Sequence, residues 1–213
     1  MRSSVPIPGN PWPHDMVLSV EDNPKALIDM LWVREAWGLQ PDGDDLPPLL
    51  ADQSVREHSE SVDVSKRALW QSAWPSVWAA CVDHAGRVST EDLFTRLHQT
   101  ANGSAERAEL LRELLGPDWR DRFGDEAFDE RYRAWTTGNF EALFRGHRRP
   151  LDEDPERVSL ASLVPAWEAG LTRVVTVPCA GTHSRKIGPH TLLVTAETRE
   201  NPERYAEALD GFR

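Results

Sequence analysis

Apolar residues recur at helical spacing along most of the chain. Asn23-Pro24 is typical of a helix start, because Asn caps the first turn and Pro fits into it, and Gly38 is typical of a helix end. Between these signals, one face of the predicted helix carries a set of large apolar residues: Leu27, Met30, Leu31 and Trp37. We therefore expect this helix to pack against a core.

The longest predicted helix begins at a cap at Asp63 and contains a stripe of tryptophans. Trp70, Trp74 and Trp78 are spaced by four residues, so they lie along one helix face. A stripe with this spacing is typical of a buried core, and its alternative is a surface that holds an aromatic ligand or a partner. Pro75 lies within the stripe, and we expect it to bend or split the helix.

Cap residues and amphipathic spacing predict further helices at residues 105–114, 125–135 and 160–169, and one that starts at Asn201-Pro202. The helix at 105–114 follows another short helix with helix-turn-helix proportions. It is acidic, because Glu106, Glu109 and Glu113 outnumber its arginines. A recognition helix that meets phosphates should be basic, so we expect no nucleic-acid binding.

Three runs are rich in β-branched residues: 16–20, 171–177 and 191–196. The last two show little alternation of polar and apolar positions, which favours strands covered by helices on both faces. The polar, glycine-bearing stretch between them predicts a β-hairpin. The fold class is therefore α+β, mainly α-helical, with a small antiparallel hairpin or sheet near the C-terminal end.

A polar segment with a proline, 151–158, is the best linker candidate. It divides the chain into a mainly helical region, 1–150, and an α-β-β-α region, 151–213, that packs on it. We expect the two regions to form one compact unit, because the chain is long enough for a single core. Oligomeric state is left open by the sequence.

The amino-acid composition disfavours several classes of function. The chain carries 35 acidic and 24 basic residues, a net charge of −11, which disfavours general nucleic-acid binding. Neither a signal peptide nor an apolar run of membrane-spanning length is seen, and two cysteines make no disulfide framework. These features favour a soluble cytoplasmic protein that does not bind membranes.

The candidate functional site is the loop 179–190, because residues 169–196 contain no acidic side chain in an otherwise acidic chain. Its glycines expose backbone N–H groups, and its side chains supply hydroxyls and cations. The predicted ligand-binding residues are Thr182, His183, Ser184, Arg185 and Lys186. This pattern predicts a binding or regulatory protein that receives an anionic small molecule or an acidic protein segment. It matches neither a phosphate loop nor a dinucleotide-binding motif.

The alternative is an enzyme that acts on an anionic small molecule, with Cys179 or His183 at its centre. Nearby cations, including Arg185 and His190, would lower the pKa of the Cys179 thiol and make it nucleophilic. An acidic residue that orients a histidine would have to come from outside the loop. The catalytic candidates are therefore Cys179, His183 and His190.

Two cysteine–histidine pairs raise the question of a metal. Cys81 with His84 and Cys179 with His183 would together make a tetrahedral zinc set. Cys81 belongs to an apolar helix, however, where a free cysteine is usually a small buried hydrophobe. We therefore expect no metal and no other cofactor.

Overall fold

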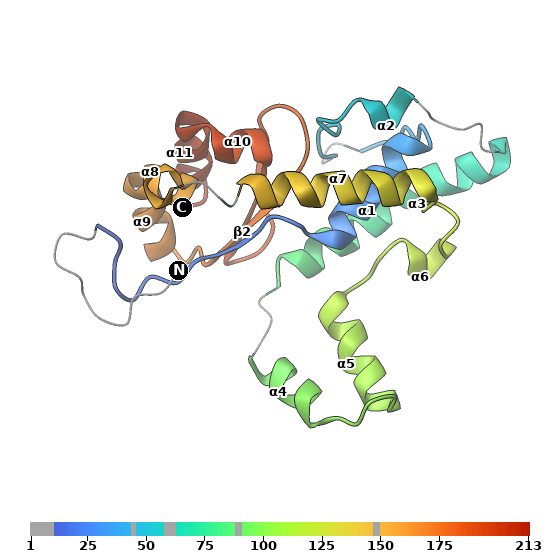
Figure 1. Ribbon diagram of the computed structural model, residues 1–213, viewed down its shortest axis with the longest axis horizontal. Coiled ribbons are helices and arrows are strands. Elements are labelled where there is room, and N and C mark those ends of the chain that lie inside the picture. Colours follow the sequence, from blue (N-terminus) through green and yellow to red (C-terminus); the bar gives the residue numbers. More distant parts are fainter. Residues whose placement is uncertain (1–10, 44–45, 58–62, 88–90, 147–149) are drawn as a thin grey trace.

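A computed structural model describes residues 11–43, 46–57, 63–87, 91–146 and 150–213. It consists mainly of helices around a small mixed sheet, most of which is formed near the C-terminal end of the chain (Figure 1). The predicted mainly helical α+β class is confirmed. In the described part of the chain, none of the helices combines the length and the apolar character needed to cross a bilayer.

The helices are α1 (Lys25–Ala36), α2 (Ser54–Glu57), α3 (Val64–Ala85), α4 (Glu91–Gln99), α5 (Ala105–Leu115), α6 (Arg120–Phe123), α7 (Glu130–Gly146), the 3-10 helix η1 (Leu151–Glu153), α8 (Pro155–Val158), α9 (Leu160–Glu168), α10 (Ala196–Glu200) and α11 (Pro202–Asp210). The strands are β1 (Ser19–Glu21), β2 (Arg173–Val177), β3 (Ser184–Lys186) and β4 (Thr191–Thr195), in the sheet order β1-β2-β4-β3.

The predicted hairpin between residues 171–177 and 191–196 is wrong in its pairing direction. β2 and β4 are parallel neighbours, and the antiparallel pair is β3 with β4. The cause lies in the connection. Where β2 ends, Ala51 N–H donates to the Pro178 carbonyl over 3.0 Å and Ala180 N–H donates to the Leu49 carbonyl over 2.8 Å. These bonds lead the chain away from β2, and it returns through β3 before it forms β4.

Helices cover both faces of the sheet, as the lack of alternation predicts. On one face Val175 and Leu193 join the core formed with α1 and α3. On the other face Val174 and Leu192 pack with α9 and α11. Neighbouring strand residues point to opposite sides, so each side needs its own apolar cover.

The tryptophan stripe of α3 is part of the core, as predicted. Trp70, Trp74 and Trp78 are 2%, 0% and 4% exposed. α3 continues through Pro75 without a break, which contradicts a split of the helix at this point. Packing of the tryptophans on both sides of Pro75 offsets the backbone hydrogen bond that proline cannot donate.

Helix α7 starts later than the predicted helix at 125–135 and runs further. The Asp129 carboxylate accepts hydrogen bonds from the N–H groups of Arg131 and Tyr132, at 3.0 and 3.1 Å, and so satisfies donors of the first turn. In the view of Figure 1 α7 crosses α1, and the Trp32 ring of α1 lies 5.6 Å from the Tyr132 ring and 5.2 Å from the Trp135 ring of α7, between centroids. This placement brings its first turns beside the start of α1.

The predicted linker 151–158 forms η1 and all of α8, and it lies in the same lobe as α9 and α11 (Figure 1). β1, from the N-terminal part of the chain, pairs with β2. The sheet thus joins residues from both sides of the division proposed at residue 150.

Replacement of Asp154 by Asn should change how stability depends on pH. Burial, together with the neighbouring Glu156 carboxylate, raises the pKa of Asp154 to about 6. Folding therefore favours the protonated form, and the stability from this group is present below the unfolded pKa and is lost as pH rises through about 6. Asn stays neutral and can still accept the hydrogen bond from Glu156 N–H that caps α8.

We expect the Asp154→Asn variant to gain free energy of unfolding relative to the wild type as pH rises from about 4 to about 7. Urea denaturation at a series of pH values measures this difference. A difference that stays constant over the range would show that Asp154 titrates at its ordinary pKa in the folded protein.

Candidate functional site

The loop after β2 places the predicted ligand-binding residues at one edge of the sheet, on or next to β3: Thr182, His183, Ser184, Arg185 and Lys186. Gly181 N–H donates to the Glu197 carboxylate over 2.8 Å, and His183 N–H donates to the Thr198 hydroxyl over 3.0 Å. The acid-free stretch therefore meets an acid from α10, and two of its backbone donors are used within the fold.

Two further residues of this loop are held by internal contacts. Lys186 Nζ donates to the Phe212 carbonyl over 3.2 Å and lies 4.1 Å from the centroid of the Phe212 ring. The Nδ1 atom of His190 is 2.7 Å from the Gly170 carbonyl oxygen. An anion that binds Lys186 would compete with the Phe212 contact, so anion binding at this edge stays a prediction.

Both cysteines are buried in the same core. Cys179 is 0% exposed, and burial raises the pKa of its thiol to about 12. Cys81 is 2% exposed with a pKa also raised to about 12 by burial, and its thiol donates to the Pro117 carbonyl over 3.2 Å. The nucleophile would be the thiolate, which is scarce at neutral pH when the pKa is this high. The geometry therefore does not favour nucleophilic chemistry at Cys179.

Both side chains of the first cysteine–histidine pair, Cys81 and His84, contact backbone carbonyls. The Nε2 atom of His84 is 2.9 Å from the Glu113 carbonyl oxygen, which connects the end of α3 to α5. Among the residues that the structure describes, no three His, Cys, Asp or Glu side chains come together as metal ligands.

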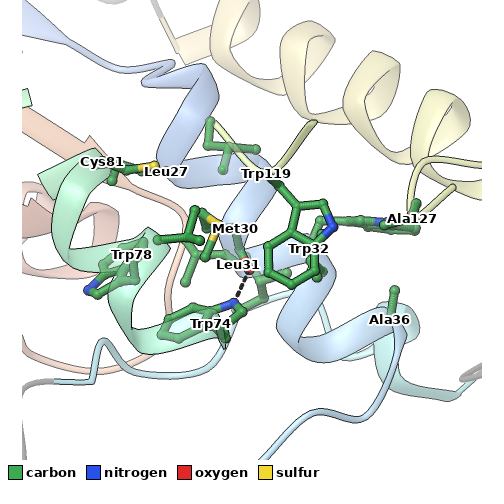
Figure 2. Packing of buried hydrophobic residues seen from close by; sticks show 14 of the residues in the cluster. Leu27, Met30, Leu31, Trp32, Ala36, Trp74, Trp78, Cys81, Trp119 and Ala127 are labelled. Atoms are coloured by element: carbon green, nitrogen blue, oxygen red, sulfur yellow. Dashed lines mark hydrogen bonds between the residues drawn. The ribbon is translucent and has the colours of Figure 1, made fainter. Parts of the chain in front are cut away.

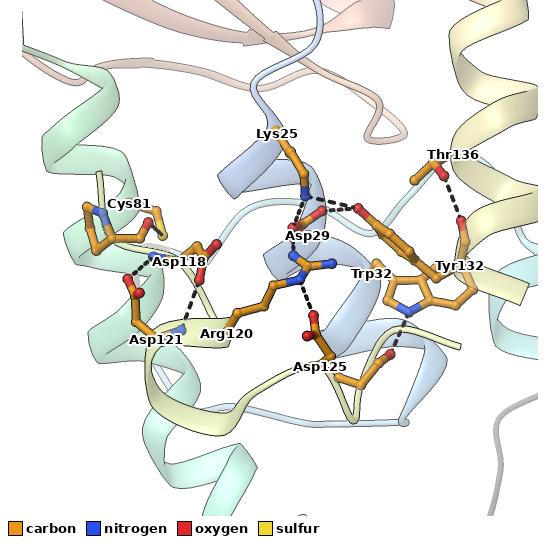
Figure 3. A network of polar contacts seen from close by, with 12 residues as sticks. Lys25, Asp29, Trp32, Cys81, Asp118, Arg120, Asp121, Asp125, Tyr132 and Thr136 are labelled. Carbon is orange, nitrogen blue, oxygen red and sulfur yellow. Dashed lines mark hydrogen bonds and ion pairs between the residues drawn. The ribbon is translucent and has the colours of Figure 1, made fainter. Parts of the chain in front are cut away.

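The structure brings together a polar cluster that the loop-based hypothesis does not include. We call it the Asp29 cluster, and it consists of Lys25, Asp29, Arg120 and Tyr132, from α1, α6 and α7 (Figure 3). The Asp29 side chain is only 1% exposed. Its carboxylate accepts from Lys25 Nζ at 2.5 Å, from Arg120 Nη1 and from the Tyr132 hydroxyl. Three donors thus converge on one buried carboxylate.

The Asp29 cluster has one more positive than negative charge, because two cations meet one carboxylate. Arg120 also donates through Nε to Asp125 over 2.7 Å, but the Asp125 side chain is 85% exposed, so solvent screens that pair. The guanidinium of Arg120 lies 3.5 Å from the centroid of the Phe128 ring. Although burial disfavours its charge, the nearby Asp29 raises the pKa of Arg120, so it stays a cation.

A cavity of about 570 Å³ lies beside the Asp29 cluster. Its other polar lining comes from Asn23, Asp118, Thr136, Thr137 and Asn139. Thr136 and Thr137 donate their hydroxyl hydrogens to backbone carbonyls of α7, so their oxygens are acceptors toward the cavity. The cavity therefore combines cationic donors with neutral acceptors, and Asp118 is an acid on its wall.

No family model matches this chain, and no curated protein and no solved structure matches it significantly. Function must be argued from the geometry of the site.

One signal in the sequence points toward the Asp29 cluster. Asp29 lies in the run Leu27–Val33 of α1, in which all the remaining residues are apolar. A carboxylate inside a buried run requires a cationic partner, because an unpaired buried charge is very costly. The sequence offers one such partner, Lys25, four residues earlier on the same helix, but it does not identify the other two, because Arg120 lies 91 residues away and Tyr132 lies 103 residues away.

Proposed function

We propose that this protein binds a small organic carboxylate in the cavity beside the Asp29 cluster, as a cytoplasmic binding or regulatory protein. The observation that carries the proposal is the convergence of Lys25 and Arg120 on Asp29 beside a cavity, although the second carboxylate on the wall, Asp118, balances the remaining positive charge. A chain of net charge −11 repels anions on average, so a position where two cationic side chains lie together is the feature that an anionic ligand would use.

Lys25 is the residue that best fits direct contact with the ligand. Its ammonium has three N–H donors, and two of them are directed to Asp29 and Tyr132. The Lys25 side chain is 66% exposed, so the remaining donor can reach a carboxylate without loss of the Asp29 contact. Thr136 and Thr137 can accept a hydrogen bond from a hydroxyl or ammonium group of the same ligand.

The cluster fits binding better than catalysis. Burial, together with the hydrogen bond to Asp29, raises the pKa of Tyr132 above its ordinary value, so the phenol stays protonated at neutral pH and is a poor base. The cavity lining includes no cysteine and no histidine. The loop 179–190 at the edge of the sheet is the alternative binding site for an anion. A ligand bound there would also make the protein a binding or regulatory protein.

Replacement of Lys25 by Met should weaken carboxylate binding roughly ten- to hundred-fold, which is the effect of a lost charge-assisted hydrogen bond. Calorimetric titration of the full chain with acetate, lactate and succinate measures the affinity. Binding to the wild type should weaken when salt rises from about 50 to about 500 mM, because the attraction is partly exposed to solvent.

Lys66→Met is a matched control. Lys66 also pairs with a carboxylate, Glu126, and its Nζ lies 5.7 Å from the Trp70 ring centroid, as Lys25 Nζ lies 5.8 Å from that of Tyr132. It does not line the cavity, so Lys66→Met should bind like the wild type. If Lys25→Met also binds like the wild type and Arg185→Ala does not, the ligand binds at the edge of the sheet and our placement is wrong.

A further inference from the structure

A second cavity, of about 350 Å³, lies between the start of α1, the end of α3 and the base of the α4–α5 pair. In Figure 1, α4 and α5 form a helical pair that extends away from the body of the molecule. Asn23 and Lys25 line both this cavity and the one beside the Asp29 cluster. The two cavities are therefore neighbours on either side of the first turn of α1, and the ammonium of Lys25 contacts Asp29 and Tyr132 on the wall of the first.

The second cavity has a wall of leucines, whereas Ile28 is the one aliphatic side chain among the described residues that line the first. Four leucines line the second cavity: Leu27, Leu93, Leu114 and Leu115. Leu27 and Leu93 are 1% and 6% exposed, so they belong to the buried base of this wall, whereas Leu115 is 70% exposed. A large apolar side chain this exposed at the border of a cavity is available to cover an apolar group of a ligand.

Some of the polar groups around the second cavity are engaged within the fold. Arg173 pairs with Glu21 and also donates to the Arg87 carbonyl over 3.2 Å. His84 is held by the Glu113 carbonyl. Since these polar groups already have partners, the surface that gains most from a ligand is the apolar one.

From this arrangement we infer that the ligand is a carboxylate with a hydrocarbon chain, whose head binds Lys25 and whose chain lies along the leucines of the second cavity. The inference rests on the proposed carboxylate site and specifies the class of its ligand. In the first cavity a hydrocarbon chain would lie beside the polar side chains of Asp118, Thr136 and Thr137 and could bury only one aliphatic side chain, that of Ile28. The leucine wall instead removes both the chain and its own apolar surface from water.

A homologous series of fatty-acid anions, from acetate through butanoate and hexanoate to octanoate, tests the inference. All are titrated into the full chain below their micelle-forming concentrations. We expect affinity to rise about three- to fourfold for each added methylene until the cavity is filled, which corresponds to burial of one CH₂ group. Lys25→Met should weaken every member of the series, because all share the head group.

Leu115→Ser should reduce the gain per methylene, whereas Leu151→Ser should not. Leu151 is the matched control, because it is 63% exposed and does not line the cavity, and neither change should disturb the core. Equal affinity along the series, with Lys25→Met still defective, would overturn the hydrocarbon inference and keep the carboxylate site. If no carboxylate binds the wild type, the proposed function itself fails.

Discussion

Replacement of Trp74 by Ala is expected to lower the free energy of unfolding by ~3–5 kcal/mol, which is the usual range for loss of a large buried aromatic side chain. Trp74 is 0% exposed and stacks on Trp78 with ring centroids 5.3 Å apart. Its indole N–H donates to the Met30 carbonyl over 2.8 Å, so it joins α3 to α1 (Figure 2). The substitution removes packing and leaves a buried carbonyl without that donor.

Urea denaturation followed by far-ultraviolet circular dichroism measures this loss without dependence on tryptophan fluorescence. Leu69→Ala is the control on the same helix, because Leu69 is 54% exposed, and it should change stability by no more than ~0.5 kcal/mol. Trp74→Phe keeps most of the ring and loses the N–H, so its effect should be smaller than that of Ala. A loss below ~1 kcal/mol for Trp74→Ala would contradict its placement in a tightly packed core.

Replacement of Arg199 by Met should also cost ~3–5 kcal/mol at neutral pH, because it leaves a buried carboxylate without its cation. Glu156 is 3% exposed, and both of its oxygens accept from Arg199, each at 2.7 Å. Tyr205 donates to the same carboxylate over 3.0 Å, and Arg199 also reaches Asp22 over 3.1 Å. This network connects α8, α10 and α11 to the chain after β1.

The pH dependence of the stability loss in Arg199→Met distinguishes an unpaired carboxylate from a packing defect. Although burial disfavours the charge of Glu156, the hydrogen bonds from Arg199 lower its pKa below the ordinary value. The stability from this pair is therefore present above the unfolded pKa of Glu156 and is lost as pH falls through its folded pKa. The deficit of Arg199→Met should shrink as the solution becomes acidic.

The double variant Glu156→Gln with Arg199→Met provides the second check. Because the double variant has no buried charge that needs a partner, it should recover a large part of the free energy of unfolding that Arg199→Met loses at neutral pH. Urea denaturation measures this recovery. If the double variant is as unstable as Arg199→Met alone, the loss comes from the contacts of the arginine stem and not from the unpaired carboxylate.

Helices and their caps follow from residues within four positions of one another, which is why the sequence predicts them. The Asp63 carboxylate accepts from the N–H groups of Ser65 and Lys66. Ser104 and Asn201 cap α5 and α11 in the same way, through N–H groups three residues later. Each of these interactions forms inside one turn, so neither the sheet nor the rest of the fold is needed to specify it.

Local sequence patterns do not predict the edge strand β3. Ser184, Arg185 and Lys186 carry no apolar signal, because they lie at an edge and pair on one side only, with β4. Their hydrogen bonds are made by the backbone, which any sequence can supply. The same three residues predicted a binding loop, and the structure makes them a strand.

The sequence by itself determined most of the helices, the caps at Asp63, Ser104 and Asn201, the buried tryptophan stripe and the two-sided burial of β2 and β4, since these depend on local spacing and on hydrophobicity. The cap predicted at Asn23 is wrong, because Pro24 precedes α1 and no side chain caps its first turn. Tertiary structure decided the parallel direction of β2 and β4, because that direction depends on where residues 49–51 hold the chain after β2. It also decided two of the partners of Asp29, because the guanidinium that pairs with it and the phenol that donates to it come from α6 and α7. A buried charge in the sequence requires partners, and beyond Lys25 on the same helix only the packing of distant helices selects them.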